Sequence, residues 1–442
     1  MASVQFLQNH LTLLGEDAKK TTVSWETIRY MVSDIQYGGR ITDNKDRELF
    51  LTITTSLYDA RITQPEKDCG YTFCPREPRP DLNYKYSVPL GDDIIKHREF
   101  IRETFPDTDP PDVFGMHGNA DITYRSIQTL EILSTIMEIQ PRGSGEAGGV
   151  SRSDVIKGMA DNFLKQLPPK WKPDKKEKLS DRTPLSIFAG QEIDRLALVT
   201  RVIRQTCIDL KDALDGKIIM SPVLQNAQDF LFDARVPMNW VNVAWPALSI
   251  TMWFQEVLRR LEQLDLWAKT GRPSVYWLAG FFNPQGFLTA VRQEITRGHK
   301  ADNWALDKVE TRTEVMKFDK SEFPDRPPEV YEKGAVYIYG MSLEMCAWDK
   351  AKQKMKESKA GDLFVELPVM QVYAVSTESG KERRQEAEHG GGKQKKLNKF
   401  RCAVYKYKKR TDNEWIFDVD LNCEEEPWHW KLRGVALLCT TD

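Results

Sequence analysis

The residues closest to a nucleotide-binding loop are Ser379-Gly380-Lys381-Glu382. Such a loop holds phosphates with backbone N–H groups and one lysine, in the pattern G-x-x-x-x-G-K-[ST] between a strand and a helix. Here Val375 stands at the first glycine, and Glu382 puts a carboxylate where the magnesium-binding hydroxyl belongs. Gly390 to Lys393 has the composition without the spacing. The sequence therefore predicts no nucleotide-binding P-loop in this chain.

The cysteines give no metal pattern. Cys69 and Cys74 are the one close pair, and no second pair of Cys or His follows at zinc spacing. An odd number of scattered thiols without C-x-x-C is typical of a reducing compartment. We therefore expect neither a metal site nor a disulfide framework. The seven cysteines are Cys69, Cys74, Cys207, Cys346, Cys402, Cys423 and Cys439.

Catalytic patterns are also missing. His117 has no acid or thiol near it in sequence, so we expect it to pack or to cap a helix rather than to act as a base. No G-x-S-x-G, H-E-x-x-H or dinucleotide-binding glycine pattern occurs. The sequence therefore predicts no catalytic, cofactor-binding or metal-binding residue, and this segment is not expected to be an enzyme.

Residues 393–410 hold nine Lys or Arg interleaved with Phe400, Tyr405 and Tyr407. This pattern is typical of RNA or polymer binding, and it leaves open an alternative function as a free-standing microtubule- or polymer-binding scaffold. The alternation of Phe400, Cys402 and Val404 also fits a strand, with acidic residues just before it. A solvated hairpin with a mixed-charge tip is the favoured interpretation.

Composition places the protein among globular proteins of two or three domains. It has 442 residues, 40% hydrophobic residues, 12 Trp and a net charge of −2. A near-zero charge gives no global field toward nucleic acid or an acidic membrane. The N-terminal residues lack a signal-peptide pattern, and no apolar window spans a bilayer. We therefore expect a soluble intracellular protein without nucleic-acid or membrane partners.

Helical periodicity dominates the first part of the sequence. The clearest helix covers 191–214, with apolar residues at intervals of three and four. Ser151 with Asp154 is a plausible capping box for another helix. Further helices are expected at 25–36, from Asp43 through Leu51, at 94–101 and at 224–232. Irregular or flexible connections are expected at 62–90 and 142–149.

The stretch 277–297 combines aromatic residues, a turn and an amphipathic helix. Pro284 suits the first turn of that helix, where its missing N–H has no intrahelical partner. Phe287, Leu288, Val291 and Ile295 form its apolar side. Together with Trp240, Trp245, Trp253 and Trp267 upstream, they predict an aromatic core or domain interface.

Strand periodicity takes over after residue 306. Alternation predicts strands at 309–315, 335–341, 369–375, 400–407, 415–421 and 434–439. A short helix is expected near 347–356. Six strands with few helices between them predict an antiparallel sheet closed, or nearly closed, into a barrel.

Three motifs together resemble the C-terminal region of dynein heavy chains. They are Gly280-Phe281-Phe282-Asn283-Pro284-Gln285-Gly286-Phe287-Leu288-Thr289-Ala290, Val236-Pro237-x-x-Trp240, and Trp430-x-Leu432-x-Gly434-Val435-Ala436-Leu437-Leu438. Residues 21–43 are similar to the helical lid of the sixth AAA+ module, and 283–287 followed by 292–297 look most like axonemal outer-arm chains. The sequence departs from the family at Gly118, at Met345-Cys346 and in a longer loop at 378–399.

The resemblance implies an α+β architecture in three parts. These are a helical lid at 1–125, a helical part of the C-terminal domain at 126–306, and a β-barrel part at 307–442. It also implies a set of structural and interface residues. They are Trp240, Trp277, Gly280, Phe281, Phe282, Pro284, Gln285, Phe287, Gly340, Trp348, Trp430 and Gly434.

The function implied by the resemblance is that of a non-catalytic segment of a motor. The parent would be an ATP-driven microtubule motor of cilia and flagella, with ATP and Mg²⁺ bound elsewhere in its ring. This segment would pack on the AAA+ ring and modulate its activity. Its expected partners are the ring, other dynein subunits and, through the parent's stalk, microtubules. Its expected location is the cytoplasm and the axoneme of cilia or flagella.

Overall fold

The computed structural model of the protein describes ten stretches of sequence and two compact units. Unit 1 is drawn from Met1–Ile132, Glu357–Leu363 and Glu425–Val435, and unit 2 from Leu133–Lys356, Phe364–Glu424 and Ala436–Asp442. The domain boundaries expected at residues 125 and 306 stay predictions. The described residues are 24–58, 93–104, 111–139, 151–169, 171, 182–300, 304–322, 335–376, 398–408 and 410–439.

Unit 1 is mainly helical. The first helix that the structure describes there, α2 (Trp25–Tyr30), continues as a wider π-type helix over Met31–Tyr37 and a 3-10 turn over Gly38–Arg40. The helix predicted at 25–36 is therefore present, but its second half is widened. Ser33 donates its hydroxyl to the Arg29 carbonyl at 2.5 Å, a side-chain bond that commonly bends helices.

Among the residues that the structure describes, unit 1 contains four further α-helices, and the first of them has a clear N-cap. Asp43 begins α3 (Asn44–Leu57) by accepting hydrogen bonds from the amides of Lys45 and Asp46. The unit also contains α4 (Ile94–Thr104), the first part of α5 (Asn119–Ile139) and α13 (Pro427–Arg433). The helix α13 packs against α3, although more than 360 residues separate them in sequence.

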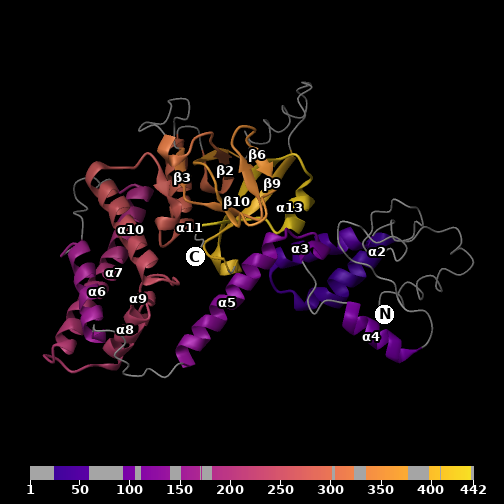
Figure 1. Cartoon of the computed structure of the whole chain (residues 1–442). Helices are drawn as coiled ribbons and strands as arrows, with labels where there is room; N and C mark the ends of the chain where they lie inside the picture. The colour runs from indigo at the N-terminus through magenta and orange to yellow at the C-terminus, as the bar shows by residue number, and fades with distance from the viewer. Residues whose placement is uncertain are drawn as a thin grey trace, which may run out of the picture. The chain divides into compact units, whose positions relative to one another are not determined.

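Unit 2 contains a layer of helices. Figure 1 shows α6 (Arg152–Gln166), α7 (Pro184–Leu214), α8 (Pro222–Phe232), α9 (Met238–Val241) and α10 (Ile250–Thr270) together. The helix α7 begins seven residues before its predicted start, because Thr183 caps it and Pro184 is tolerated in the first turn. Ser151 caps α6 by accepting a hydrogen bond from the Ser153 amide, so the predicted helix is present, while the capping box expected with Asp154 stays a prediction.

The helix α11 (Pro284–Gly298) lies beside both the helical layer and the strands (Figure 1). It contacts α7 and also strands β8 (Met370–Ser376), β10 (Trp415–Cys423) and β2 (Val309–Val315). Asn283 caps it by accepting a hydrogen bond from the Gly286 amide at 2.9 Å. The stretch predicted to be a buried amphipathic helix therefore connects the helices of unit 2 with its sheets.

The strands of the described residues form three sheets. The first has the order β1 (Tyr276–Trp277), β3 (Val336–Tyr339), β8 (Met370–Ser376), β2 (Val309–Val315). The second has the order β10 (Trp415–Cys423), β9 (Asn398–Tyr405), β11 (Ala436–Leu438), β4 (Ser342–Glu344), β7 (Phe364–Glu366). The third is the hairpin of β5 (Ala347–Asp349) and β6 (Lys354–Lys356). The predicted mixture of helices and sheets is confirmed.

The sheets differ from the predicted antiparallel barrel in two respects. The pairs β1–β3 and β11–β9 are parallel, so the sheets are mixed rather than antiparallel throughout. Within the described residues, no end strand of one sheet pairs with an end strand of another. A closed barrel is therefore not confirmed.

The helix predicted at Ala347–Lys356 is wrong. This segment forms the β5–β6 hairpin, in which Trp348 is opposite Met355. Its turn ends at Gln353, whose φ of +51° is incompatible with a continuing right-handed helix. The alanine and the lysines are good helix formers, but the tertiary packing of Trp348 overrides that local preference.

Candidate functional site

The signature segment, residues 277–287, lies in the core of unit 2. Trp277 is 5% exposed, Phe282 is 8% exposed, and Phe281 and Phe287 are fully buried. The Phe281 and Phe287 rings stack with centroids 4.8 Å apart. Burial of these rings supplies the largest apolar contribution at this point of the fold. The expectation that the segment is core is met.

Trp277 fits into a slot between two glycines. A Cβ atom at Gly280 would lie 2.4 Å from Trp277 Cε3, and one at Gly340 would lie 2.4 Å from Trp277 Cδ1. Gly340 also has a φ of +87°, which favours glycine. On another side of the ring, the Arg259 guanidinium lies 4.0 Å from its centroid. Both glycines are therefore required by the position of one indole ring.

Three charged side chains bind the backbone of the signature segment. Glu192, from α7, accepts hydrogen bonds from the amides of Phe282 at 2.7 Å and Asn283 at 3.2 Å. Arg260, from α10, donates to the Ala279 carbonyl at 3.0 Å. Lys406, after β9, donates to the Phe282 carbonyl at 2.7 Å. The helices and a sheet thus hold the same short turn from several sides.

Burial shifts the pKa of each of these groups. It raises the pKa of Glu192, while the two backbone N–H donors oppose that rise. Burial, followed by the nearby charge of Arg260, lowers the pKa of Lys406 to about 8. Burial also lowers the pKa of Arg260 to about 10. Their contacts are directed at backbone groups, so the arrangement positions the segment rather than presenting an acid and a base to a substrate.

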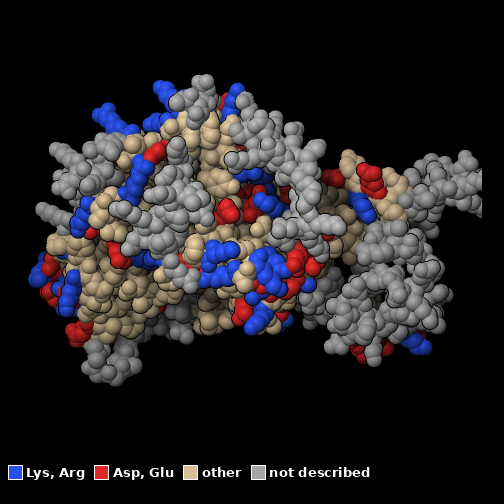
Figure 2. Space-filling model, turned by 90° about the horizontal axis from the view of Figure 1, so that it is seen from above, with Lys and Arg blue, Asp and Glu red and all other residues tan. Residues whose placement is uncertain are grey.

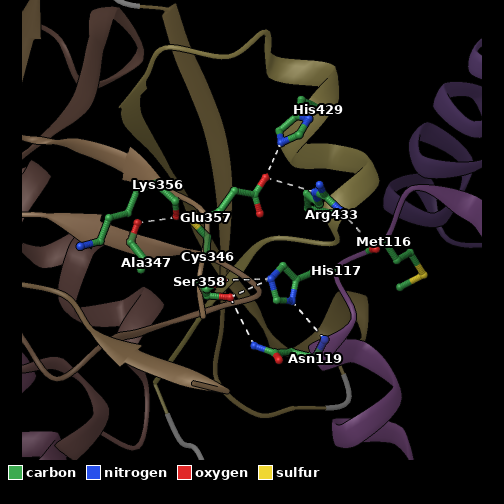
Figure 3. A network of polar contacts seen from close by, with 10 residues as sticks. All are labelled: Met116, His117, Asn119, Cys346, Ala347, Lys356, Glu357, Ser358, His429 and Arg433. Atoms are coloured by element: carbon green, nitrogen blue, oxygen red, sulfur yellow. Dashed lines mark hydrogen bonds and ion pairs between the residues drawn. The ribbon is translucent and has the colours of Figure 1, made fainter. Parts of the chain in front are cut away.

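A second cluster, called the clasp, belongs to unit 1. It consists of residues 357–363 and 425–435 with His117 and Asn119 at the start of α5 (Figure 3). The Asn119 side-chain amide donates to Ser358 Oγ and to the carbonyls of Lys359 and Asp362. Its Oδ1 accepts the Gly361 amide at 2.9 Å. Asn119 is 1% exposed, so one buried side chain organises the whole loop.

His117 caps α5 and also contacts the loop of the clasp. Its Nδ1 accepts the Asn119 amide at 3.0 Å, and its Nε2 lies 3.2 Å from the Ser358 carbonyl. This requires the tautomer with its proton on Nε2. The prediction that His117 packs or caps rather than acting as a base is therefore consistent with its contacts.

Charged pairs attach α13 to the rest of the clasp. Glu357 Oε1 accepts from His429 Nε2 at 2.7 Å and from Arg433 Nε at 3.2 Å (Figure 3). Lys431 lies 3.1 Å from Glu48 of α3. These exposed pairs contribute little each, but they select one orientation of α13.

The remaining signature residues lie at several places. Trp240 is fully buried and stacks on Trp253, with centroids 5.6 Å apart. Trp348 lies on β5 and Trp430 on α13, which are in different units. The structure therefore brings together most of the twelve residues in one core and places Trp430 and Gly434 in the clasp. Gly434 ends α13 with a φ of +74°. Pro284 is buried at the start of α11, and Gln285 donates to the Trp415 carbonyl at 2.8 Å.

Several residues of these two clusters were not predicted. Glu192 lies in the helix predicted at 191–214, whereas Arg260 and Asn119 lie in α10 and α5, two helices that were not predicted, and no local motif marks any of the three. Their partners lie 90, 19 and 239 to 243 residues away in sequence. The one feature of the sequence that could have indicated such a residue is a polar side chain at a position where the helical period predicts burial.

The basic segment is described from residue 398 onward, where it forms β9. Arg401 pairs with Asp418 at 3.0 Å, Arg410 pairs with Glu344, and Lys406 binds the signature segment. The prediction of a strand is confirmed. Space-filling Figure 2 shows basic and acidic side chains side by side on the described surface.

Other predicted features lie outside the described residues. These are Cys69 and Cys74, the P-loop-like residues 379–393, and the connections at 62–90 and 142–149. Among the residues that the structure does describe, no group of His, Cys, Asp and Glu could hold a metal ion. No helix in that part of the protein is long and apolar enough to cross a lipid bilayer.

Comparison with known families matches nearly the whole sequence in two adjoining parts. Residues 126–439 match the C-terminal domain of the dynein heavy chain, and residues 1–120 match its AAA lid domain. The protein belongs to the dynein heavy chain family. The family predicted from the sequence motifs is thereby confirmed.

The protein is similar to several axonemal dynein heavy chains. It is 40% identical over 443 residues to dynein axonemal heavy chain 5 of Mus musculus, and the match covers 99% of this chain and 9% of that protein. It is 39% identical to dynein axonemal heavy chain 8 of the same species over 442 residues, covering 99% of this chain and 8% of that protein. The sequence thus spans less than a tenth of the length of these relatives.

An outer-arm relative is among the matches. The dynein gamma chain, flagellar outer arm, of Chlamydomonas reinhardtii is 38% identical over 453 residues, covering 100% of this chain and 9% of that protein. The similarity to axonemal outer-arm dynein heavy chains, predicted from residues 283–297, is confirmed.

Proposed function

We propose that this protein is the non-catalytic C-terminal segment of an axonemal dynein heavy chain, an ATP-driven microtubule motor of cilia and flagella. Its matches to the C-terminal domain and to the AAA lid domain of dynein heavy chains support the assignment. ATP and Mg²⁺ bind elsewhere in the heavy chain, because the sequence here lacks the G-x-x-x-x-G-K-[ST] loop. The segment acts through contacts with the AAA+ ring and modulates the motor.

The clasp is the observation that carries this proposal. Residues 357–363 and 425–435 lie in the part that matches the C-terminal domain, whereas the helices they join lie in the part that matches the lid. Because the chain enters unit 1 again at 357–363 and at 425–435, the part that matches the lid is mechanically connected to the part that matches the C-terminal domain. A conformational change in the lid is then transmitted to the C-terminal domain by differential packing.

The signature residues have a complementary role in this proposal. The core around Trp277, Phe281 and Phe287 keeps the C-terminal domain stiff, so that movement at the clasp is passed on rather than absorbed. The lid at 1–125, the helical part at 126–306 and the β part at 307–442 are the proposed functional divisions. The partners are the AAA+ ring, other dynein subunits and microtubules through the stalk, and the location is the axoneme.

The test uses the full heavy chain with Asn119→Ala. This change removes the donor and acceptor that hold residues 357–363. We expect altered microtubule gliding velocity or force, with ATP binding at the other modules unchanged. Gln128→Ala is the matched control, since this amide lies on the same helix and bonds only to the exposed Tyr124 hydroxyl among the contacts described. Normal motility with a measurably loosened clasp would refute the modulating role.

The alternative function as a polymer-binding scaffold finds no support in the described part of the basic segment. Lys406 and Arg410 bind partners within unit 2, and the largely exposed Arg401 pairs with Asp418. Co-sedimentation of the isolated protein with microtubules, lost at high salt and on charge reversal at Lys393, Lys395 and Lys396, would instead favour the scaffold.

A further inference from the structure

The turn between β9 and β10 is attached to three other parts of unit 2. Lys406 donates to a carbonyl of the signature segment at 2.7 Å. The Lys408 ammonium lies 5.0 Å from the centre of the Phe364 ring on β7, and Arg410 pairs with Glu344 on β4. Three cations at alternate positions therefore connect this turn to the signature segment and to the second sheet.

The ion pair between Arg410 and Glu344 holds the turn in a strained conformation. The Glu344 side chain is 4% exposed, and a buried carboxylate depends strongly on its cation. Arg410 has a φ of +53°, a left-handed conformation that is unfavourable for a residue with a side chain. Strain of this kind persists only where surrounding contacts hold it. Weakening the ion pair should therefore loosen the turn.

Thr411, the residue after Arg410, is exposed, and its hydroxyl makes no hydrogen bond to the described residues. Its amide lies 3.5 Å from Glu414 Oε2, and its carbonyl accepts the Glu414 amide at 2.9 Å. The Arg410 amide donates to the Tyr407 carbonyl at 3.4 Å. Such short-range contacts open at low free energy. An enzyme could therefore bind this segment in an open form and reach the hydroxyl.

The sequence around Thr411 has the charge pattern of a protein kinase substrate. Lys408, Lys409 and Arg410 directly precede it. Kinases select their substrates partly by charge, and three successive cations fit an acidic substrate groove. Glu414 would suit a basic groove instead, but the three cations oppose it. The pattern therefore favours a kinase that recognises basic residues before the hydroxyl.

We propose that Thr411 is a phosphorylation site for a protein kinase of this basic-directed class. The base of the kinase takes the hydroxyl proton, the Thr411 oxygen forms a bond to the γ-phosphorus of ATP, and the bond to the departing ADP breaks. The phosphate adds about −1.5 to −2 units of charge at pH 7. The site lies in unit 2, apart from the clasp, and it does not rest on the proposed motor function.

The added phosphate changes the contacts of the turn in two ways. It competes with Glu344 for the Arg410 guanidinium, because phosphate oxygens accept strong charge-assisted hydrogen bonds from arginine. It also repels the Glu414 carboxylate, which lies beside the Thr411 amide. The turn therefore loosens from β4, and the hold of Lys406 on the signature segment weakens with it.

The test of the site uses the whole protein with the catalytic subunit of cAMP-dependent protein kinase, ATP and Mg²⁺, and maps the phosphate by mass spectrometry. We expect modification at Thr411, with an initial rate that falls by about fivefold or more in Lys408→Ala. Lys399→Ala, at an exposed position of β9, is the matched control and should keep the natural rate. Thr270 is also exposed, but it should stay unmodified because the residues two and three before it are uncharged.

Two results would overturn the site. One is an unmodified Thr411. The other is modification of Thr411 by an acidic-directed kinase, of the casein kinase 2 class, with none by the basic-directed enzyme. Equal rates in the two lysine variants would remove the charge pattern from the recognition.

Hydrogen exchange tests the effect of the phosphate on the turn. The Lys406 amide donates to the Glu414 carbonyl at 2.8 Å, and the Glu414 amide donates to Thr411. Both amides should exchange at least about fivefold faster in the phosphorylated protein, while those of β2 stay unchanged. Thr411→Val should exchange like the natural protein, because it removes the hydroxyl without adding charge. Unchanged exchange at both amides after full phosphorylation would refute the loosening of the turn.

Discussion

At the scale of single residues, the protein uses buried charge to hold backbone rather than to perform chemistry. Glu192 is 3% exposed and Arg260 is 4% exposed, yet each finds a backbone group of the signature segment. Such groups destabilise a fold strongly when one partner is removed. The loss of stability when one of these side chains is replaced is therefore the most direct measure of how strongly they hold the signature segment.

Glu192→Gln should destabilise unit 2. The amide keeps one acceptor oxygen, but its NH₂ group would face one of the two backbone N–H donors at Phe282 and Asn283. We expect a loss of about 1–3 kcal/mol in the free energy of unfolding, measured by urea denaturation. Glu262→Gln, at an exposed position of α10, should change it by less than about 0.5 kcal/mol. Equal losses in the two variants would refute the role of Glu192.

Lys406 should make stability depend on pH in the alkaline range. Its pKa in the folded protein is lowered to about 8 by burial and by Arg260, with opposing effects from Glu192 and Cys439. Between pH 8 and its ordinary value of 10.5, the unfolded protein binds more protons at this residue than the folded one. The contribution of Lys406 to the free energy of unfolding therefore rises with pH across that window.

Lys406→Met should abolish this contribution. The difference in unfolding free energy between the natural protein and the variant should grow from pH 8 to pH 10 in urea titrations. Lys399→Met, at an exposed position of β9, should give no such change. A pH-independent difference for Lys406→Met would show that this lysine does not carry a lowered pKa.

At the scale of elements, the helices and strands that a local pattern of residues determines could be predicted from the sequence. The helical period of α7 and the alternation of β2 are visible in a dozen residues, and both elements are present. The β5–β6 hairpin was missed because its turn uses Gln353 at positive φ instead of a glycine. The parallel pairing of β1 with β3 joins residues about 60 apart, which no local pattern reports.

The candidate site was predictable only in its apolar half. The aromatic residues from Trp277 to Phe287 were expected to be buried because they follow a recognisable pattern. The clasp could not be predicted, because the donors of Asn119 and the acceptors of residues 358–362 meet only in the folded protein. Long-range polar pairing is the part of a fold that a single sequence conceals.

The turn after β3 should tolerate no side chain at its glycine. Gly340→Ala would bring a methyl group against Trp277 and strain a φ of +87°. We expect a loss of about 1–2 kcal/mol from the backbone and about 1–3 kcal/mol more from overpacking, measured by chemical denaturation. Gly216→Ala is the matched control, since its φ is +74° and the space around it is open. Similar losses at both positions would mean that the Trp277 slot contributes nothing.

At the scale of the whole molecule, two compact units predict two unfolding events. Each unit has its own packed interior, with Ile28 and Asn119 buried in unit 1 and Phe281 and Glu192 in unit 2. Units with separate cores commonly unfold separately. Scanning calorimetry of the whole protein should therefore show two transitions, one for each unit.

Variants in the two clusters should shift different transitions. Asn119→Ala removes the contacts that hold the clasp. It should lower the free energy of unfolding of unit 1 by about 2–4 kcal/mol, and with it the temperature of that unit's transition. Hydrogen exchange at residues 357–363 should become faster. Glu192→Gln should lower only the temperature of the unit 2 transition. The double variant should show the sum of the two losses, because the residues share no described partner. Asn162→Ala, an exposed amide on α6, serves as the control. A single transition that both substitutions lower equally would contradict the division into two units, and with it the view that the clasp is a separable mechanical connection.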